Sequence, residues 1–295
     1  KIYKITLLSL FIFIFTISPL LNLAEAIDAQ KLLKEVDDNL WSNTKFISGR
    51  LIIDNGRKVR TLTQDSWMEG VERSYSHYKS PAREKGTKML KIKGKLWMYT
   101  PRTDRKILIA GHLLRQSMMG SDLSYEDMME DHKLSQSYIA TFDRLQSIKG
   151  TEYTILNLAA RDKKTTYQTR KVWINPKDKT ILQEERFAKT GKLLKRILFK
   201  DYELIDDRIF PRTMIFKDLL KKNTQTSYKF DVIKFDLDIP DHYFSISISL
   251  IYLIHGQLPE PRTQPKQPRP SALRGHRWRG TACGGYALAL TLTSS

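Results

Sequence analysis

The sequence predicts a mainly β fold: one antiparallel, strongly curved sheet of ten or eleven strands, with a helix in front and a helical insertion midway. Strand-like runs recur every eight to twelve residues between turn signals, which is typical of an antiparallel sheet or barrel. Residues 28–41 carry apolar side chains three and four positions apart, the spacing of an amphipathic helix. Residues 111–132 interrupt the alternation, and these two helical segments are the only candidates to cover one face of the sheet.

The first half of the chain is expected to form the helix and then hairpins. Asp28 is a suitable N-cap for the helix over 28–41. Asn55-Gly56 stands between two strand-like runs and is a strong hairpin signal. The pattern then indicates a strand over 71–80, a loop over 81–87, a hairpin that turns at Gly94-Lys95, and another strand after Pro101-Arg102.

The insertion, residues 111–132, holds four of the chain's eight methionines. Tyr125, Met128 and Met129 stand at i, i+3 and i+4, Ser124 can cap a short helix, and Gly120 breaks the segment. We therefore expect helix, break, helix. Further strands are predicted over 134–150, 151–160, 165–175, 180–191, 192–205, 208–218 and 224–239, with a last turn over 239–244.

The two ends of the chain differ from this core. Residues 1–26 read as a cleaved signal peptide, with basic residues, the apolar run Leu7–Ile17 and an A-x-A site at Ala24-Glu25-Ala26; an uncleaved anchor is the alternative. Residues 251–295 are rich in proline and have no strand or helix period, so we expect a disordered linker and tail, or out-of-frame translation. The domain is predicted to span 27–250.

Charge and cysteine content limit the classes of function. The single cysteine, Cys283, excludes an intramolecular disulfide, so an exported chain must depend on a packed core. Between the two ends, 42 basic and 30 acidic residues give about +12. A basic surface attracts nucleic acid, anionic lipid headgroups or acidic proteins, and export disfavours nucleic acid. A generally basic, solvated surface is the alternative.

No pattern of catalytic or metal-binding residues stands out. His77, His112, His132 and His242 are scattered, and none forms a metal-ligand spacing. Ser117 and Ser121 do not sit on a nucleophile elbow, and no phosphate-cradling loop is present. Glu184 and Glu185 are neighbours on a strand, so they point to opposite faces and read as turn or solvent-facing residues. We expect no metal, no cofactor and no enzymatic activity, and a binding role instead.

An apolar cavity beneath the insertion is the candidate site. Strand residues are apolar on both sides around Trp97 and around Trp173, which implies burial on both faces or a wall that faces a cavity; a filled core is the alternative. Methionine adapts to irregular space and is common at promiscuous surfaces, so the insertion suits a lid over variable acyl chains. The predicted ligand-binding residues are Trp97, Tyr99, Leu114, Met118, Met119, Leu123, Met128, Met129 and Trp173.

Three stretches carry a resemblance to a known family: "SPAREKGTKMLKIKGKLWMYTPRTDRKILIAGHLLRQSMMGSDLSYEDM" (80–128), "KVWINPKDKTILQEERFAKTGKLLKR" (171–196) and "IFPRTMIF" (209–216). The chain resembles the outer-membrane lipoprotein-sorting family, the LolA-like periplasmic carriers, from about residue 27 to 244. The resemblance implies an incomplete β-barrel closed by helices. It also implies an interior arginine that holds the lid; of Arg50, Arg60 and Arg73 on the early strands, no motif singles one out.

The resemblance implies a function for the domain. Such carriers take lipoprotein acyl chains from an inner-membrane release complex and pass them to an outer-membrane acceptor. We therefore expect a monomeric periplasmic carrier of acyl chains or another lipid in a Gram-negative envelope, with no nucleic acid partner. The alternatives are an accessory module that docks an exporter or a membrane partner without carrying lipid, and a lipid hydrolase.

Overall fold

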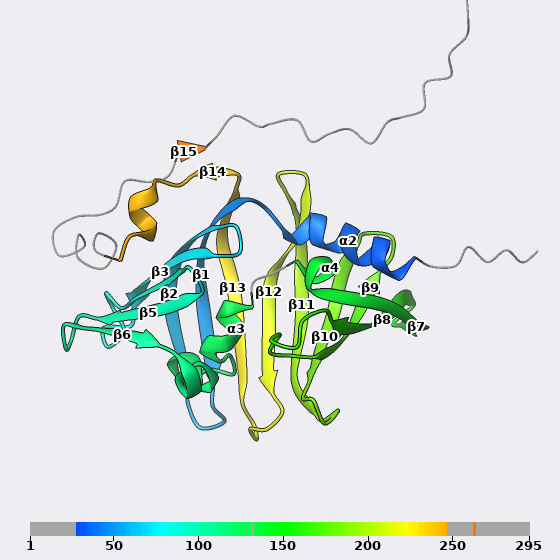
Figure 1. The fold of residues 1–295 in the computed structure, drawn as a ribbon, viewed down its shortest axis with the longest axis horizontal. Helices are drawn as coiled ribbons and strands as arrows, with labels where there is room; N and C mark the ends of the chain where they lie inside the picture. Colours follow the sequence, from blue (N-terminus) through cyan, green and yellow to red (C-terminus); the bar gives the residue numbers. More distant parts are fainter. Residues whose placement is uncertain (1–27, 131–132, 247–261, 264–295) are drawn as a thin grey trace, which may run out of the picture. The chain divides into compact units, whose positions relative to one another are not determined.

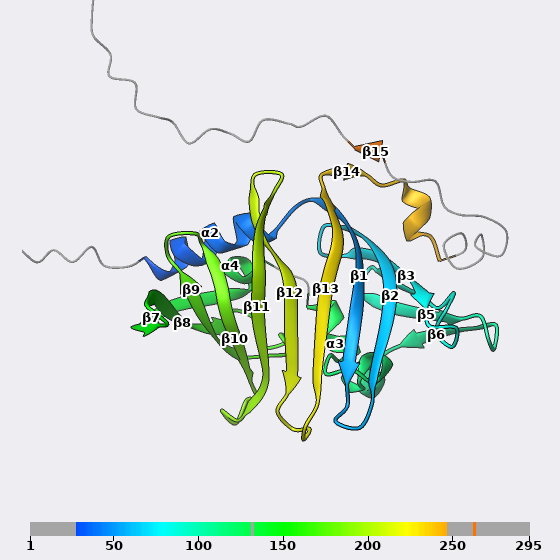
Figure 2. The same cartoon turned by 180° about the vertical axis from the view of Figure 1, so that it is seen from behind.

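The computed structural model describes residues 28–130, 133–246 and 262–263, and its main element is a thirteen-stranded antiparallel sheet. Both edges of the sheet bend toward the same side, so the sheet is strongly curved but does not close (Figures 1 and 2). The predicted single curved sheet is confirmed, with thirteen strands rather than ten or eleven. The strands are β1 Thr44–Asp54, β2 Val59–Glu69, β3 Arg73–Ser80, β4 Lys88–Ile92, β5 Lys95–Thr100, β6 Arg105–Ile109, β7 Tyr138–Ile148, β8 Thr151–Ala160, β9 Thr169–Asn175, β10 Thr180–Phe187, β11 Leu193–Ile205, β12 Arg208–Asp218 and β13 Gln225–Phe235.

The sheet consists of two meanders that meet in the middle. Strand β1 pairs with β2 on one side and with β13 on the other, while β6 and β7 form the two outer edges. Apart from the β1–β13 pair, all adjacent strands of this sheet are also consecutive in sequence. The chain must therefore pass from one edge to the other between β6 and β7, and the helical insertion is this connection.

Helix α2, Ala29–Leu40, covers one end of the concave face (Figure 1). The Asp28 carboxylate accepts a hydrogen bond of 2.9 Å from the Lys31 amide, which confirms the predicted N-cap. Leu33 and Val36 are fully buried against β7–β12. The helix therefore supplies the cover that this half of the sheet needs.

The insertion forms short helical turns rather than two full helices. They are the 3₁₀ turns Gly111–Arg115 and Met118–Gly120, helix α3 (Tyr125–Met129) and helix α4 (Leu134–Ser137). Ser124 caps α3 in a reciprocal capping box with Asp127, as the sequence indicated for Ser124. The strand predicted from residue 134 begins at Tyr138 instead. Residues 134–137 turn because the Leu134 and Ser135 amides donate to the buried Asp37 carboxylate of α2, at 3.0 and 2.8 Å.

The last described turns pack on the convex face of β2–β5. Tyr243 and Phe244, in the 3₁₀ turn Asp241–Phe244, are buried against Trp67 and Tyr75, and the Trp67 and Tyr243 rings lie 5.0 Å apart. Within the predicted tail, β15 (Arg262–Thr263) pairs with β14 (Leu237–Asp238), so these two residues are not irregular. The rest of the tail and the predicted signal peptide lie outside the described residues. None of the helices in the described ranges combines the length and the apolar character that a bilayer span requires.

Candidate functional site

The insertion, Gly111–Glu130, lies over the concave face and is called the lid here (Figure 1). Its apolar side chains pack on the β1–β6 half of the sheet. Six of the nine predicted site residues meet in this one cluster: Leu114, Met118, Met119, Leu123, Met128 and Met129. The sheet contributes Leu51, Ile53, Leu62, Tyr78, Met89, Leu96, Met98 and Ile109 from β1–β6, and Tyr228 from β13. We call this the lid cluster.

Methionine sulfur atoms accept hydrogen bonds from two tyrosine hydroxyls of the lid cluster. The Tyr78 hydroxyl donates to the Met89 and Met118 sulfurs, each at 3.9 Å. The Tyr125 hydroxyl of the lid donates to the Met98 sulfur at 3.8 Å. Burial raises the pKa of Tyr78 far above its ordinary value, so this hydroxyl stays neutral. The cluster therefore joins lid and sheet through weak, adaptable contacts.

The other three predicted residues lie on the opposite face. Trp97 packs with Leu90 and the convex aromatic cluster, and Tyr99 shares its side of β5. Trp173 alternates with Val172 and Ile174, which face α2, so the indole points to the convex side, where its Nε1 donates to Gln146 at 3.0 Å. The structure therefore does not bring these three residues to the lid; the concave side chains of β5 are Leu96 and Met98.

Polar contacts fasten the lid backbone at several points. Arg60 on β2 donates to the Met119 carbonyl and pairs with Glu84. Lys91 on β4 donates to the Met129 carbonyl at 3.0 Å. These bonds hold the lid over the apolar half. Of the three early arginines that the sequence left open, Arg60 is the one that reaches the lid.

Asp122 fastens the middle of the lid to the β12–β13 turn. Asp122 is only 2 % exposed. Its carboxylate accepts hydrogen bonds from the Thr224 and Thr226 hydroxyls, at 2.6 and 2.7 Å. The Asp218 amide also donates to it, at 3.2 Å. Three donors thereby satisfy this buried carboxylate, which makes it a structural anchor.

The second half of the concave face, β9–β11, meets the lid through buried charges. Asp127 of α3 accepts from Arg186 at 3.0 Å and from Lys195, and the Tyr167 hydroxyl donates to it at 2.8 Å. Arg170 pairs with Glu130 at the end of α3 and with Glu184 at 2.8 Å. Arg186 also donates to Glu184, at 2.8 Å. We call these six residues the charge network: Asp127, Glu130, Arg170, Glu184, Arg186 and Lys195.

The cations of this network keep its buried carboxylates ionised. Burial alone would raise the pKa of Asp127, but Arg186 and Lys195 outweigh it and hold the pKa well below its ordinary value. Burial likewise opposes ionisation of Glu184, and Arg186 and Arg170 lower its pKa despite this. Both carboxylates are therefore ionised at neutral pH, although Arg170 and Glu184 have side chains only 3 % and 4 % exposed.

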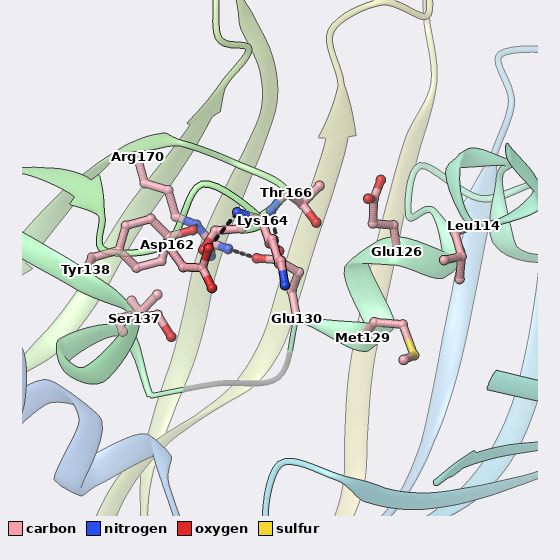
Figure 3. Close-up of a pocket in the computed structure, with 12 residues that line it drawn as sticks. Leu114, Glu126, Met129, Glu130, Ser137, Tyr138, Asp162, Lys164, Thr166 and Arg170 are labelled. Atoms are coloured by element: carbon pink, nitrogen blue, oxygen red, sulfur yellow. Dashed lines mark hydrogen bonds and ion pairs between the residues drawn. The ribbon is translucent and has the colours of Figure 1, made fainter. Parts of the chain in front are cut away.

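A cavity of about 350 Å³ opens beside the network, between the lid, α4 and the loop 161–168. Figure 3 shows Arg170, Glu130 and Tyr138 on one side of it, and Leu114, Met129 and Glu126 on the other. Its volume is at the lower end of ligand pockets. The cavity therefore joins the charge network to the apolar lid side chains.

The sequence reading missed the charge network. It took Glu184 and Glu185 for turn or solvent-facing residues, which is wrong for both, because both lie within β10 and are buried. The two do face opposite sides: Glu185 pairs with Arg196 on the convex face, at 2.7 Å. A usable signal was present, because Arg170 alternates with the apolar Val172 and Ile174 and so lies on a buried face. In the described part of the chain, no three His, Cys, Asp or Glu side chains are placed to hold a metal ion.

Residues 70–247, more than half of the chain, match the model of a family described as "-like: Uncharacterized protein". The chain belongs to this family. Among the curated proteins no relative was found.

Several solved structures share the fold of this chain. A DUF1329 family protein from Desulfovibrio piger is 22% identical over 74% of this chain and 96% of its own, with a TM-score of 0.68. A LolA superfamily protein from Nitrosomonas europaea is 22% identical over 75% of this chain and 98% of its own, with a TM-score of 0.64. An outer membrane lipoprotein-sorting protein domain from Vibrio parahaemolyticus is 19% identical over 74% of this chain and 96% of its own, with a TM-score of 0.65. The expected LolA-like incomplete barrel is thereby confirmed.

Proposed function

We propose that this protein is a carrier that holds acyl chains of lipoproteins, or of another lipid, between the lid and the β1–β6 half of the sheet. The observation that carries the proposal is the lid cluster: six residues of one connecting segment converge on an open, curved, apolar wall. The lid is a covalent connection between the two sheet edges, so it can move off the wall without breaking any strand pairing. No covalent chemistry or cofactor enters this proposal.

Methionine suits a site that must both bind and release. Each buried methylene contributes roughly 0.8 kcal/mol, so one long acyl chain supplies on the order of 10 kcal/mol before costs. In the closed state Met118 is 3 % exposed and occupies part of the wall that a chain would cover. We propose that the methionines also cover a bound chain, so their contacts with the empty wall offset only part of the affinity that they add, and this offset favours delivery.

The proposed setting is the periplasm of a Gram-negative envelope. The LolA superfamily and lipoprotein-sorting names of two similar structures support it, as does the signal-like sequence of residues 1–26. The proposed partners are an inner-membrane release complex or exporter as donor and an outer-membrane acceptor. We propose that the carrier acts as a monomer.

A fluorescent acyl probe tests the carrier proposal. Serine at Met118, Met119, Met128 and Met129 together should weaken probe binding by about tenfold or more while the sheet remains folded by circular dichroism. Serine at Met68 and Met214, which pack outside the lid cluster, is the matched control and should leave binding unchanged. Unchanged binding in the folded quadruple variant would refute the lid as a binding element.

The accessory-module and hydrolase alternatives make different predictions for the same protein. Native mass spectrometry after purification from a periplasm should show co-purifying lipid if the protein is a carrier. A lipid-free protein with a bound envelope partner would support the accessory module, and loss of an ester lipid on incubation would support a hydrolase.

A further inference from the structure

The charge network is balanced only while the lid is closed. On the concave face of β9–β11 it comprises three cations, Arg170, Arg186 and Lys195, and one carboxylate, Glu184. The two balancing carboxylates, Asp127 and Glu130, belong to the lid. When the lid lifts, this part of the wall keeps an excess of two positive charges.

The two arginines are held in place by groups that do not belong to the lid. The Nε of Arg170 donates to the Tyr138 hydroxyl at 2.6 Å, and its guanidinium carbon lies 4.8 Å from the Tyr138 ring centroid. The Tyr167 ring lies 5.5 Å from Arg170 and 5.2 Å from Arg186. Glu184 binds both arginines. The two guanidiniums are therefore oriented whether or not the lid carboxylates are present. Lys195, whose contacts are with Asp127 and Ser124 of the lid, lies opposite Arg186 on the neighbouring strand and adds an ammonium.

Three partly buried cations without the two lid carboxylates are energetically unfavourable, so another anionic group must take the place of Asp127 and Glu130 when the lid opens. Removing one partner of a buried ion pair leaves an uncompensated charge, which strongly opposes lid opening on its own. An anionic group that enters as the lid leaves removes this obstacle. The cavity beside Arg170 is lined mostly by polar residues, and Leu114 and Met129 on its far side place apolar side chains next to the charges.

We propose that Arg170, Arg186 and Lys195 form a binding site for the anionic headgroup of a lipid, a phosphate or carboxylate, and that Asp127 and Glu130 occupy this site as internal substitutes when no cargo is bound. This proposal rests on the proposed carrier function and specifies its cargo as an anionic amphiphile. Guanidinium groups bind phosphate and carboxylate through paired, charge-assisted hydrogen bonds, and lysine adds a point charge. The acyl chains would lie on the neighbouring lid cluster.

Two fluorescent lipids that differ only in the headgroup test the proposal: a phosphatidic acid and the diacylglycerol with the same chains. The full-length protein should bind the phosphate lipid at least roughly tenfold more tightly. Lys195→Gln should remove most of this preference, while the control Arg196→Gln, next in sequence but on the convex face, should retain it. Asp127→Asn with Glu130→Gln should bind the phosphate lipid more tightly and keep the preference, because the internal competitor is gone.

The outcomes separate this inference from the carrier proposal. Binding of both lipids with equal affinity, or a preference that Lys195→Gln leaves intact, would overturn the headgroup site while leaving the carrier proposal standing. Failure to bind either lipid would refute the carrier proposal. Inorganic phosphate should displace the phosphate lipid only at far higher concentrations; displacement at the concentration of the probe would overturn the assignment to a lipid.

Discussion

The two halves of the concave face meet the same lid in opposite ways. On β1–β6 the contact is apolar and rich in sulfur, and the hydroxyls of Tyr78 and Tyr125 donate to methionine sulfurs. On β9–β11 the contact consists of buried ion pairs that involve Asp127 and Glu130. One short segment thus carries a soft surface and a charged surface side by side.

This difference separates adaptability from specificity. Dispersion and sulfur contacts are weak individually and tolerate many shapes, so the apolar half can accept either its own lid or another hydrocarbon. Buried charges tolerate few arrangements, because any unmatched charge is costly. The apolar half can therefore supply affinity, while the charged half determines where the lid sits and which headgroup can replace it.

The largest effect is expected at Arg170. Arg170→Met leaves Glu130 without its cationic partner and Glu184 with one arginine instead of two, so the free energy of unfolding should fall by about 3–5 kcal/mol. Urea denaturation of the variant measures this. Adding Glu184→Leu to Arg170→Met should recover part of the loss; a double variant that loses the full sum of the two single effects would show that the residues do not act as a network.

Leu62→Ala tests the apolar half at a fully buried side chain of the lid cluster. The substitution removes buried apolar atoms and leaves a cavity, so the free energy of unfolding should fall by about 3 kcal/mol. The same urea titration measures it. A loss below about 1 kcal/mol would mean that lid methionines refill the space, which would itself demonstrate how adaptable this half is.

The sequence predicted the parts of this comparison that depend on neighbouring residues. The Asp28 cap, the Asn55-Gly56 hairpin and the Ser124 cap each involve groups within a few positions, and all three formed as expected. The helical insertion was predicted for the same reason, because its spacing breaks the strand pattern, and the six lid residues of the lid cluster lie on it.

The parts that depend on distant residues were not predicted. The pair Arg186–Asp127 joins positions 59 apart, and Arg170–Glu130 joins positions 40 apart. Nothing in the local pattern reveals that the chain crosses between the sheet edges after β6 and so brings them together. Trp97 and Trp173 were placed beside the cavity because both faces of their strands are apolar, and alternation cannot tell the concave face from a convex face that is also covered.

Acid should weaken the charged half before it affects the apolar half. Asp127 has a lowered pKa in the folded protein, so its contribution to stability is complete above the pKa of the unfolded chain, about 3.9, and is lost as the pH falls below that value. The difference in unfolding free energy between the wild type and Asp127→Asn should be constant from pH 7 to 5 and shrink below pH 4. A difference that persists undiminished at pH 2.5 would mean that Asp127 stabilises the lid through its hydrogen bonds alone.

The smallest effect is expected at an ion pair whose hydrogen-bond distances resemble those of the charge network but whose side chains are exposed. Arg50 and Asp231 form a paired contact, with nitrogen–oxygen distances of 2.9 and 2.7 Å, but their side chains are 47 % and 42 % exposed. Water and salt screen such a pair, so Arg50→Gln should change the unfolding free energy far less than Arg170→Met does, and less still in high salt. Were this variant as unstable as Arg170→Met, hydrogen-bond geometry rather than burial would explain the charge network, and lid opening would no longer require an anion to replace Asp127 and Glu130.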